Sequence, residues 1–377
     1  MPFTIKDIDK ILNINKLVEK SKITSLYNCV PRGCEVFTGF EQSRNSDLKN
    51  TQWSYWKNLI QYVLEKNCDF IYLLNSPKRL EIENPNFNKQ LETLELLLGE
   101  LRKIGVNKLR VASLQLMNFI GKNYPDFKIL ASTSLEYKII SEYQNFLNFH
   151  PEVIQIVPSH DLNKNFDLLK NIQKKYPKIE IELIVNEGCI QGCPNRYIHA
   201  SSRIDKGTTI NNELSLSDGY ATSFCGNITE KYPLQSFVLS NNIFPWNIKE
   251  YSKIGINNFK FVGRDVFLIY STQMYIDRYC LYLKGVDNIS NIKDYPLSHF
   301  IHRLTGIPAY NQLTVNCFKK YLPDIKHFIK KGHLCASRCD VECKYCYKCA
   351  DKIQKVFLKK QKDKEKIPSR VSACCIN

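Results

Sequence analysis

The strongest constraint on the fold is a regular alternation of short apolar runs with longer helical patterns over the first 265 residues. Most of these runs carry β-branched or aromatic residues and end at Asn, Ser, Thr, Pro or Gly, as buried parallel strands do. The expected strands are 22–30, 70–75, 107–113, 127–133, 152–158, 179–186, 241–246 and 258–264, of which 241–246 is the weakest. Eight β–α units in this length predict an α/β fold, a TIM-like (β/α)8 barrel rather than an open sheet.

The segments between these runs have the periodicity of amphipathic helices. One face of the helix expected at 53–67 is formed by Trp56, Leu59, Ile60, Val63 and Leu64. Gly105 is placed to end the helix that begins near residue 88, because glycine favours the position after a helix. Asp161 is placed to cap the start of the helix expected at 161–176.

The chain is expected to divide into a barrel and a helical extension. The barrel covers 1–265 and contains a long loop at 189–236, and loops of that length are functional or disordered. The extension covers 266–377 and contains a cysteine cluster at 335–349 that is expected to bind metal. No apolar run approaches the roughly 18 residues of a membrane span, and the N-terminus lacks a signal-peptide core. We therefore expect a cytoplasmic protein without membrane contact.

The charge balance favours anionic partners. Lys and Arg together number 53 against 37 Asp and Glu, which gives a net charge of +16 at pH 7. Such an excess attracts polyanions, so the candidate partners include RNA as well as an anionic small molecule. A biased genome composition produces the same lysine excess without any nucleic-acid partner, so both interpretations stay open.

The chain has fifteen cysteines, and their clustering without a secretion signal indicates metal binding rather than disulfides. The candidate ligands form two tight groups and one outlier: Cys189, Cys193, Cys225, Cys335, Cys339, Cys343, Cys346 and Cys349. Five others are expected as buried small hydrophobic residues: Cys29, Cys34, Cys68, Cys280 and Cys317.

The loop "NEGCIQGCPNRYIHA" (186–200) follows the sixth expected strand directly. Cys189 and Cys193 lie four residues apart there, and Cys225 is the obvious third thiol. Arg196 and His199 follow and are suited to bind an anion. Thiolates suit both zinc and iron–sulfur clusters, and this spacing does not separate the two. A pair of buried free cysteines is the alternative without metal.

The second group is the tail "CASRCDVECKYCYKC" (335–349), with five thiols. Four of them, Cys339, Cys343, Cys346 and Cys349, suit one four-thiolate site, and Cys335 then joins the barrel cysteines in another; other partitions stay open. The expected cofactor is one or two 4Fe–4S clusters, with structural zinc as the alternative. Residues 339–346 also have the spacing of radical-SAM enzymes, but their place near the C-terminus and the fourth thiol argue against an open iron.

Several stretches resemble the collagenase-like peptidase family, U-thirty-two, in its short single-barrel branch. They are "KIEIELIVNEGCIQGCPNRYIHA" (178–200), "GINNFKFVGRD" (255–265), "YPDFKILASTSL" (124–135) and "CDVECKYCYKCADKI" (339–353). The resemblance implies a TIM-like barrel. Several members are iron–sulfur proteins of oxygen-independent hydroxylation that act on RNA bases or ubiquinone precursors.

For this chain, the resemblance implies that Cys189, Cys193 and Cys225 are cluster ligands and that Arg264 faces the cavity. Longer members have a Glu-x-Phe-x-His-Gly stretch before their cysteines, where this chain has "VNEG", so Glu187 matches only loosely. A tail cysteine would have to replace their fourth ligand.

The sequence therefore predicts an iron–sulfur enzyme that modifies a substrate in the barrel cavity, by oxygen-independent hydroxylation or related redox chemistry. The expected substrate-binding residues are Glu187, Arg196, His199 and Arg264. An electron donor and a homologous subunit are further candidate partners. The alternatives are a basic RNA-binding module with structural zinc, a radical-SAM-type enzyme and a peptidase. For the last, the sequence has no H-E-x-x-H, no G-x-S-x-G and no evident nucleophile–base pair.

Overall fold

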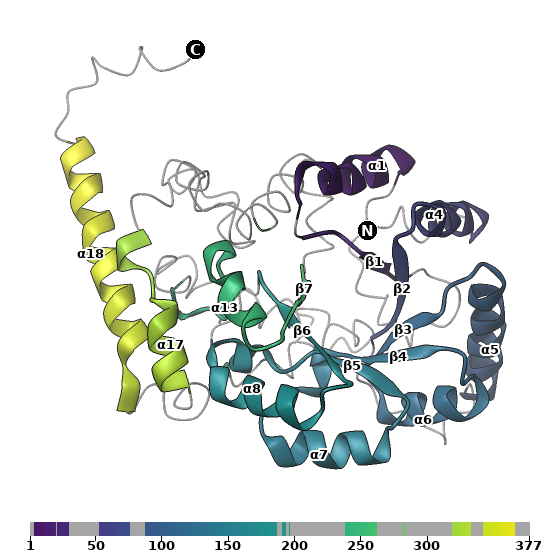
Figure 1. The fold of residues 1–377 in the computed structure, drawn as a ribbon. Coiled ribbons are helices and arrows are strands. Elements are labelled where there is room, and N and C mark those ends of the chain that lie inside the picture. The colour runs from purple at the N-terminus through teal and green to yellow at the C-terminus, as the bar shows by residue number, and fades with distance from the viewer. Residues whose placement is uncertain are drawn as a thin grey trace, which may run out of the picture.

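The computed structural model describes residues 4–19, 21–29, 53–75, 87–186, 191–193, 196, 238–261, 282, 319–332 and 342–365 (Figure 1). Its centre is a seven-stranded sheet in which all neighbours are parallel and the strands follow chain order. The strands are β1 (Ser25–Asn28), β2 (Asp69–Leu74), β3 (Lys108–Val111), β4 (Lys128–Ala131), β5 (Val153–Ile156), β6 (Glu180–Ile184) and β7 (Asn258–Lys260). An α/β architecture is thus confirmed.

The sheet curls so that its first and last strands approach each other. Tyr27 of β1 donates a hydrogen bond from its hydroxyl to the carbonyl of Phe261, just after β7. The Nζ atom of Lys260 lies 4.4 Å from the centre of the Tyr27 ring. This curled parallel sheet is consistent with the predicted TIM-like barrel.

The strand predicted at 241–246 is wrong. Ser240 forms only an isolated bridge, residues 241–244 are irregular, and Pro245–Asn247 form the short 3-10 helix η6. The proline ring removes an amide donor that a strand would need. The Asn241 carbonyl accepts from the side chain of Asn163 at 2.7 Å, so a side chain replaces a strand partner there. The strand predicted at 258–264 is β7, which is the seventh strand within the described residues rather than the predicted eighth.

Helices cover the outer side of the sheet (Figure 1). They are α1 (Ile5–Asn13), α4 (Trp53–Glu65), α5 (Phe87–Lys103), α6 (Leu114–Asn123), α7 (Ile140–Phe149), α8 (Phe166–Lys175) and α13 (Ile248–Ser252), with the 3-10 turns η1 (Ile14–Leu17), η3 (Thr133–Leu135) and η4 (His160–Lys164). The predicted face of α4 is confirmed, since Trp56, Leu59, Ile60 and Val63 are buried. Gly105 has φ +88° two residues after α5, as its role in ending that helix requires. No helix in the described ranges is long and apolar enough to cross a membrane.

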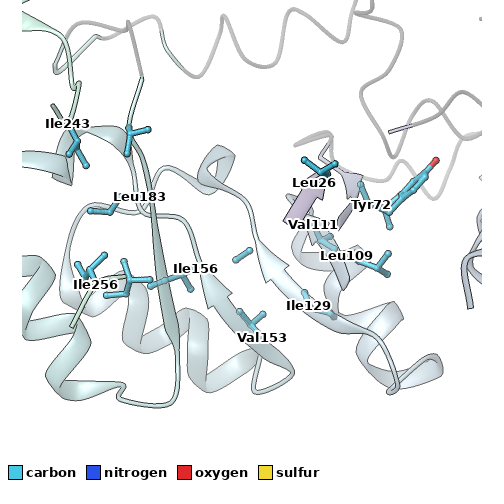
Figure 2. Packing of buried hydrophobic residues seen from close by; sticks show 14 of the residues in the cluster. Leu26, Tyr72, Leu109, Val111, Ile129, Val153, Ile156, Leu183, Ile243 and Ile256 are labelled. Atoms are coloured by element: carbon cyan, nitrogen blue, oxygen red, sulfur yellow. The ribbon is translucent and has the colours of Figure 1, made fainter. Parts of the chain in front are cut away.

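The two faces of the sheet have different partners. Alternate residues such as Leu109, Val111 and Ile129 face the helices and form the main core (Figure 2). On the other face Ile71, Leu73, Leu130 and Cys29 form a small separate cluster. The inner face is also polar, which the sequence did not predict: Arg110 in β3 lies 2.8 Å from a Glu182 carboxylate oxygen in β6 and donates to Gln155 in β5.

Cys29 and Cys68 are buried, as expected of small hydrophobic residues. Burial, together with the nearby Asp69 carboxylate, raises the pKa of the Cys68 thiol to about 12. At pH 8 we therefore expect Cys68 in the native protein to react with iodoacetamide about a thousandfold more slowly than an unperturbed thiol, because the thiolate is the nucleophile. Mass spectrometry of time points, with urea-unfolded protein as the reference, measures this; native labelling at the unfolded rate would contradict it.

The C-terminal extension contributes η11 (Lys319–Tyr321), α17 (Ile325–Lys331) and α18 (Tyr345–Glu365), which lie side by side at the left of Figure 1. Helix α17 packs on the junction between η4 and α8. The Nζ atom of Lys164 lies 5.4 Å from the centre of the Phe328 ring. A Cβ atom on Gly332 would lie 2.8 Å from the Lys164 carbonyl oxygen and 2.9 Å from the Phe166 amide. The absence of a side chain at 332 thus permits close docking.

Replacing Gly332 with alanine is therefore expected to lower the free energy of unfolding by about 1–3 kcal/mol, because the new methyl group would meet rigid backbone. Gly99 is the matched control: it lies inside α5 and has no neighbouring atom within 4 Å of the added Cβ. Gly99→Ala should raise the free energy of unfolding by about 0.5–1 kcal/mol. Urea denaturation of both variants measures the difference, and equal effects of the two would contradict the docking.

Candidate functional site

A buried polar cluster lies where the carboxyl ends of β4, β5 and β6 meet. It is built from η3 and residues 136–138, from Ser159 and η4, from 191–193 with Arg196, and from segment 238–242. In curled parallel sheets of this kind the carboxyl ends of the strands form the functional face. Asp161 lies at the centre of the cluster.

Asp161 does not cap α8, contrary to the expectation from the sequence. The 3-10 turn η4 occupies 160–164, so the helix starts five residues later and Asn165 caps it, accepting from the Leu168 amide at 3.0 Å. The Asp161 carboxylate is instead turned into the protein, where its side chain is 1% exposed.

Four groups from three other segments surround that carboxylate. Its Oδ1 atom accepts from Arg196 Nη2 at 2.7 Å, from the Gly192 amide at 2.8 Å and from Asn241 Nδ2 at 3.2 Å. Its Oδ2 atom lies 2.8 Å from Lys138 Nζ. Burial alone would raise the pKa of Asp161, but the hydrogen bonds and charges of Arg196 and Lys138 outweigh burial and hold it well below its usual range. Asp161 is therefore ionised at neutral pH.

A second carboxylate, Glu136, faces the same arginine. Its Oε2 atom accepts from the Ser159 hydroxyl at 2.7 Å and lies 3.4 Å from Arg196 Nη1. Glu136 has left-handed backbone angles, φ 52° and ψ 29°, at the end of η3. Arg196 thus bridges carboxylates from two strand ends, and its predicted role in binding an anion stays a prediction.

These bonds anchor the loop that carries Cys193. The Gln191 amide donates to the Leu239 carbonyl at 3.1 Å, and Gly192, with φ +68°, donates to Asp161. On the other side the Arg196 amide donates to the Cys193 carbonyl at 3.3 Å. Cys193 lies between the two anchors and is partly exposed, and its role as a metal ligand stays a prediction.

Two further residues of η4 hold segment 238–242 against the sheet. The buried Lys164 ammonium donates to the Ser240 carbonyl at 2.7 Å. Asn163 donates through its amide nitrogen to the Ile184 carbonyl at 2.8 Å and to the Asn241 carbonyl at 2.7 Å. Since Phe328 packs on Lys164, the same turn joins the barrel site to the extension.

In the extension, Cys343 precedes α18, and Cys346 and Cys349 lie buried on its first turns. Burial, together with the neighbouring Cys346 thiol, raises the pKa of Cys349. The Cys343 sulfur lies 3.2 Å from Nε2 of His327, a residue of α17 that the sequence interpretation did not select.

Seven predicted site residues lie outside the described part of the chain: Glu187, Cys189, His199, Cys225, Arg264, Cys335 and Cys339. Among the residues that are described, no three side chains of the His, Cys, Asp and Glu types gather around one metal position. The ligand sets and the partition of the cysteines therefore stay predictions. The site residues that the sequence missed are Glu136, Lys138, Asp161, Asn241 and His327.

No protein-family model matches the chain. The chain is similar to a protein named as an uncharacterized protease of Methanocaldococcus jannaschii, at 21% identity over 267 residues that cover 69% of this chain and 72% of the relative. The U32 peptidase Mk0906 superimposes with a TM-score of 0.39 and 13% identity, over 50% of this chain and 70% of the other. CpGH84B gives a TM-score of 0.36 and 11% identity, over 96% and 72%.

The archaeal relative is named as a protease, and the motifs quoted above resemble those of the U32 peptidase family. At such low sequence identity, the role of a residue in either superposed structure cannot be assigned to a residue of this chain.

Proposed function

We propose that this chain is an iron–sulfur enzyme that modifies a substrate at the carboxyl-end face of its sheet, by oxygen-independent hydroxylation or related redox chemistry. The observation that carries the proposal is the anchored position of Cys193. Gly192 and Arg196 are fixed at that face by the buried Asp161 carboxylate, and Cys193 belongs to the C-x3-C pair that follows β6.

The proposed cluster ligands at this face are Cys193 with Cys189, Cys225 and Cys335. Their thiolate donors fit an iron–sulfur cluster, and the partly exposed Cys193 side chain is accessible to one. A bound cluster would supply one-electron transfer. In this proposal Arg196 positions the loop that carries Cys193, while Glu187, His199 and Arg264 contact the substrate.

Lys138 is a further proposed substrate contact. Its ammonium pairs with Asp161, yet its side chain is 42% exposed at the rim of the site. An ammonium has three donors, so those not directed at Asp161 can bind an anionic substrate or co-substrate.

Anaerobic purification followed by iron and sulfide analysis tests the proposal. The wild type should contain iron and inorganic sulfide in equal amounts, and Cys193→Ser should lose most of both. Cys68→Ser is the matched control, because Cys68 is buried directly before β2, at the amino ends of the strands, and is not a proposed ligand. This variant should retain both iron and sulfide. Stoichiometric zinc without iron in the wild type would rule the proposal out.

Peptide hydrolysis is a second candidate, because the archaeal relative is named a protease and because Cys343 lies within hydrogen-bond distance of His327. A thiol beside an imidazole is the arrangement of cysteine nucleophiles. Turnover of an unfolded protein substrate that Cys343→Ala abolishes would favour this candidate. A wild-type protein with no such turnover would remove it.

A further inference from the structure

The ammonium of Lys164, in η4, is buried without a carboxylate partner among the described residues. It donates to the main-chain carbonyls of Ser240 at 2.7 Å and Val238 at 3.4 Å, and its Nζ atom lies 5.4 Å from the centre of the Phe328 ring. Taking an ammonium out of water is costly, and a carboxylate is the usual compensation. Carbonyls and an aromatic ring compensate less, so stability alone does not explain this lysine.

The two carbonyls belong to the segment that holds the cysteine loop. Val238 and Leu239 are helical and the residue after them is not, so their carbonyls have no partner further along a helix. Lysine side chains satisfy carbonyls in such positions. The Leu239 carbonyl, which lies between the two that Lys164 binds, accepts from the Gln191 amide at 3.1 Å. The ammonium therefore fixes the backbone on both sides of an acceptor for the loop that carries Cys193.

The extension contacts the same lysine at two points. Phe328 of α17 covers the ammonium. A Cβ atom on Gly332 would lie 2.8 Å from the Lys164 carbonyl oxygen, so the end of α17 rests directly on the backbone of η4. Lys164 thus contacts both the extension and segment 238–242.

We propose that Lys164 is a positioning residue through which the C-terminal extension holds the Cys193 loop at the functional face. The link runs from the Phe328 ring through the ammonium to the Leu239 carbonyl and the Gln191 amide. This inference rests on the proposed function for the importance of Cys193, but the link itself requires no bound cluster.

Lys164→Met separates positioning from stability. Methionine keeps an unbranched apolar stem but cannot donate to the two carbonyls. The amides of Gln191 and Gly192 should therefore exchange with deuterium at least about tenfold faster, since a hydrogen bond to a charged group contributes about that factor. Mass spectrometry of the peptide that contains both amides, from exchange of the full chain, measures this local opening.

Ile120→Val is the control for a general loss of stability. Ile120 is fully buried in α6, outside the link described above. The substitution should raise the unfolding equilibrium constant about two- to tenfold and leave the exchange of Gln191 and Gly192 unchanged.

A second variant tests the contribution of the extension, and keeps the test decisive if Lys164→Met disturbs folding. Phe328→Leu retains an apolar side chain but removes the ring over the ammonium, so the same two amides should exchange about two- to fivefold faster. Ile329→Leu is its matched control, because Ile329 lies next to Phe328 on α17 and is exposed. This variant should exchange like the wild type.

Wild-type exchange rates in Lys164→Met, or a rise no larger than in Ile120→Val, would overturn the inference. Faster exchange in Lys164→Met without any change in Phe328→Leu would also overturn it, because the extension would then have no part in the link. A protein without iron that shows the expected exchange rates would remove the proposed function and support this inference. An iron–sulfur protein with unchanged rates would do the reverse.

Discussion

Asp161→Ala is expected to lower the free energy of unfolding by about 3–5 kcal/mol, the usual cost of breaking a buried ion pair. The loss is large because Arg196 and the Gly192 amide would stay buried after their shared acceptor is removed. Urea denaturation at pH 7 measures it. Iron content should fall as well, because the loop that carries Cys193 loses its anchor.

Asp126 provides the matched control. It also pairs with an arginine, Arg102, but the two side chains are 51% and 48% exposed. Exposed pairs contribute about 0–1 kcal/mol, so Asp126→Ala should be nearly neutral. Similar losses in the two variants would contradict the role assigned to the buried carboxylate.

The same pair predicts how stability depends on pH. Because folding lowers the pKa of Asp161, its contribution is fully present above the unfolded pKa of about 3.9 and is lost as the pH falls through the acid range. Between about pH 5 and pH 2 the wild type should therefore lose more stability than Asp161→Asn, which has no carboxylate to protonate. If the free energy of unfolding fell equally with pH in the two proteins, this prediction would be contradicted.

The second large effect is expected inside the curled sheet, at Arg110 and Glu182. Arg110 is 1% exposed, and its ion pair with Glu182 spans β3 and β6. Gln155 accepts a hydrogen bond from Arg110 and donates one to Glu180 at 3.0 Å, so it extends the network from the ion pair to Glu180. Glu182→Ala should lower the free energy of unfolding by about 3–5 kcal/mol, because the buried Arg110 guanidinium would lose its charged partner without gaining contact with water. Denaturant titration measures the change.

A double variant separates the strength of this pair from the cost of breaking it. Replacing both partners by apolar residues of similar volume, Arg110→Met with Glu182→Leu, should recover most of the stability lost in Glu182→Ala, since no buried charge is left unpaired. A double variant no more stable than Glu182→Ala would contradict this expectation, because the stability lost there would then not come from an unpaired buried charge.

Local sequence patterns were sufficient to predict most strands of the sheet and most of the helices that cover it. The apolar run of β2 and the one-sided face of α4 are properties of adjacent residues, and burial follows from them directly. Segment 241–246 is also apolar, but its backbone bonds to the side chain of Asn163, more than seventy residues earlier. The sequence of the segment contains no signal of that contact, so the irregular backbone could not be predicted from it.

The site was less predictable because its contacts are long-range. A carboxylate shortly before a helical pattern is typical of an N-cap, and Asp161 matches that pattern while binding Lys138, Arg196 and Asn241 instead. The one local signal was its place directly after the fifth strand, where functional residues gather. His327 gave no signal at all, since it becomes notable only when α17 and α18 pack together.

The central claim, that the cysteines at the sheet's functional face hold an iron–sulfur cluster, is tested most directly by the low-temperature EPR spectrum of the anaerobically purified, dithionite-reduced protein. We predict the signal of a reduced iron–sulfur cluster in the wild type and its loss in Cys193→Ser. A wild-type protein that gives no such signal and contains no iron would contradict the account.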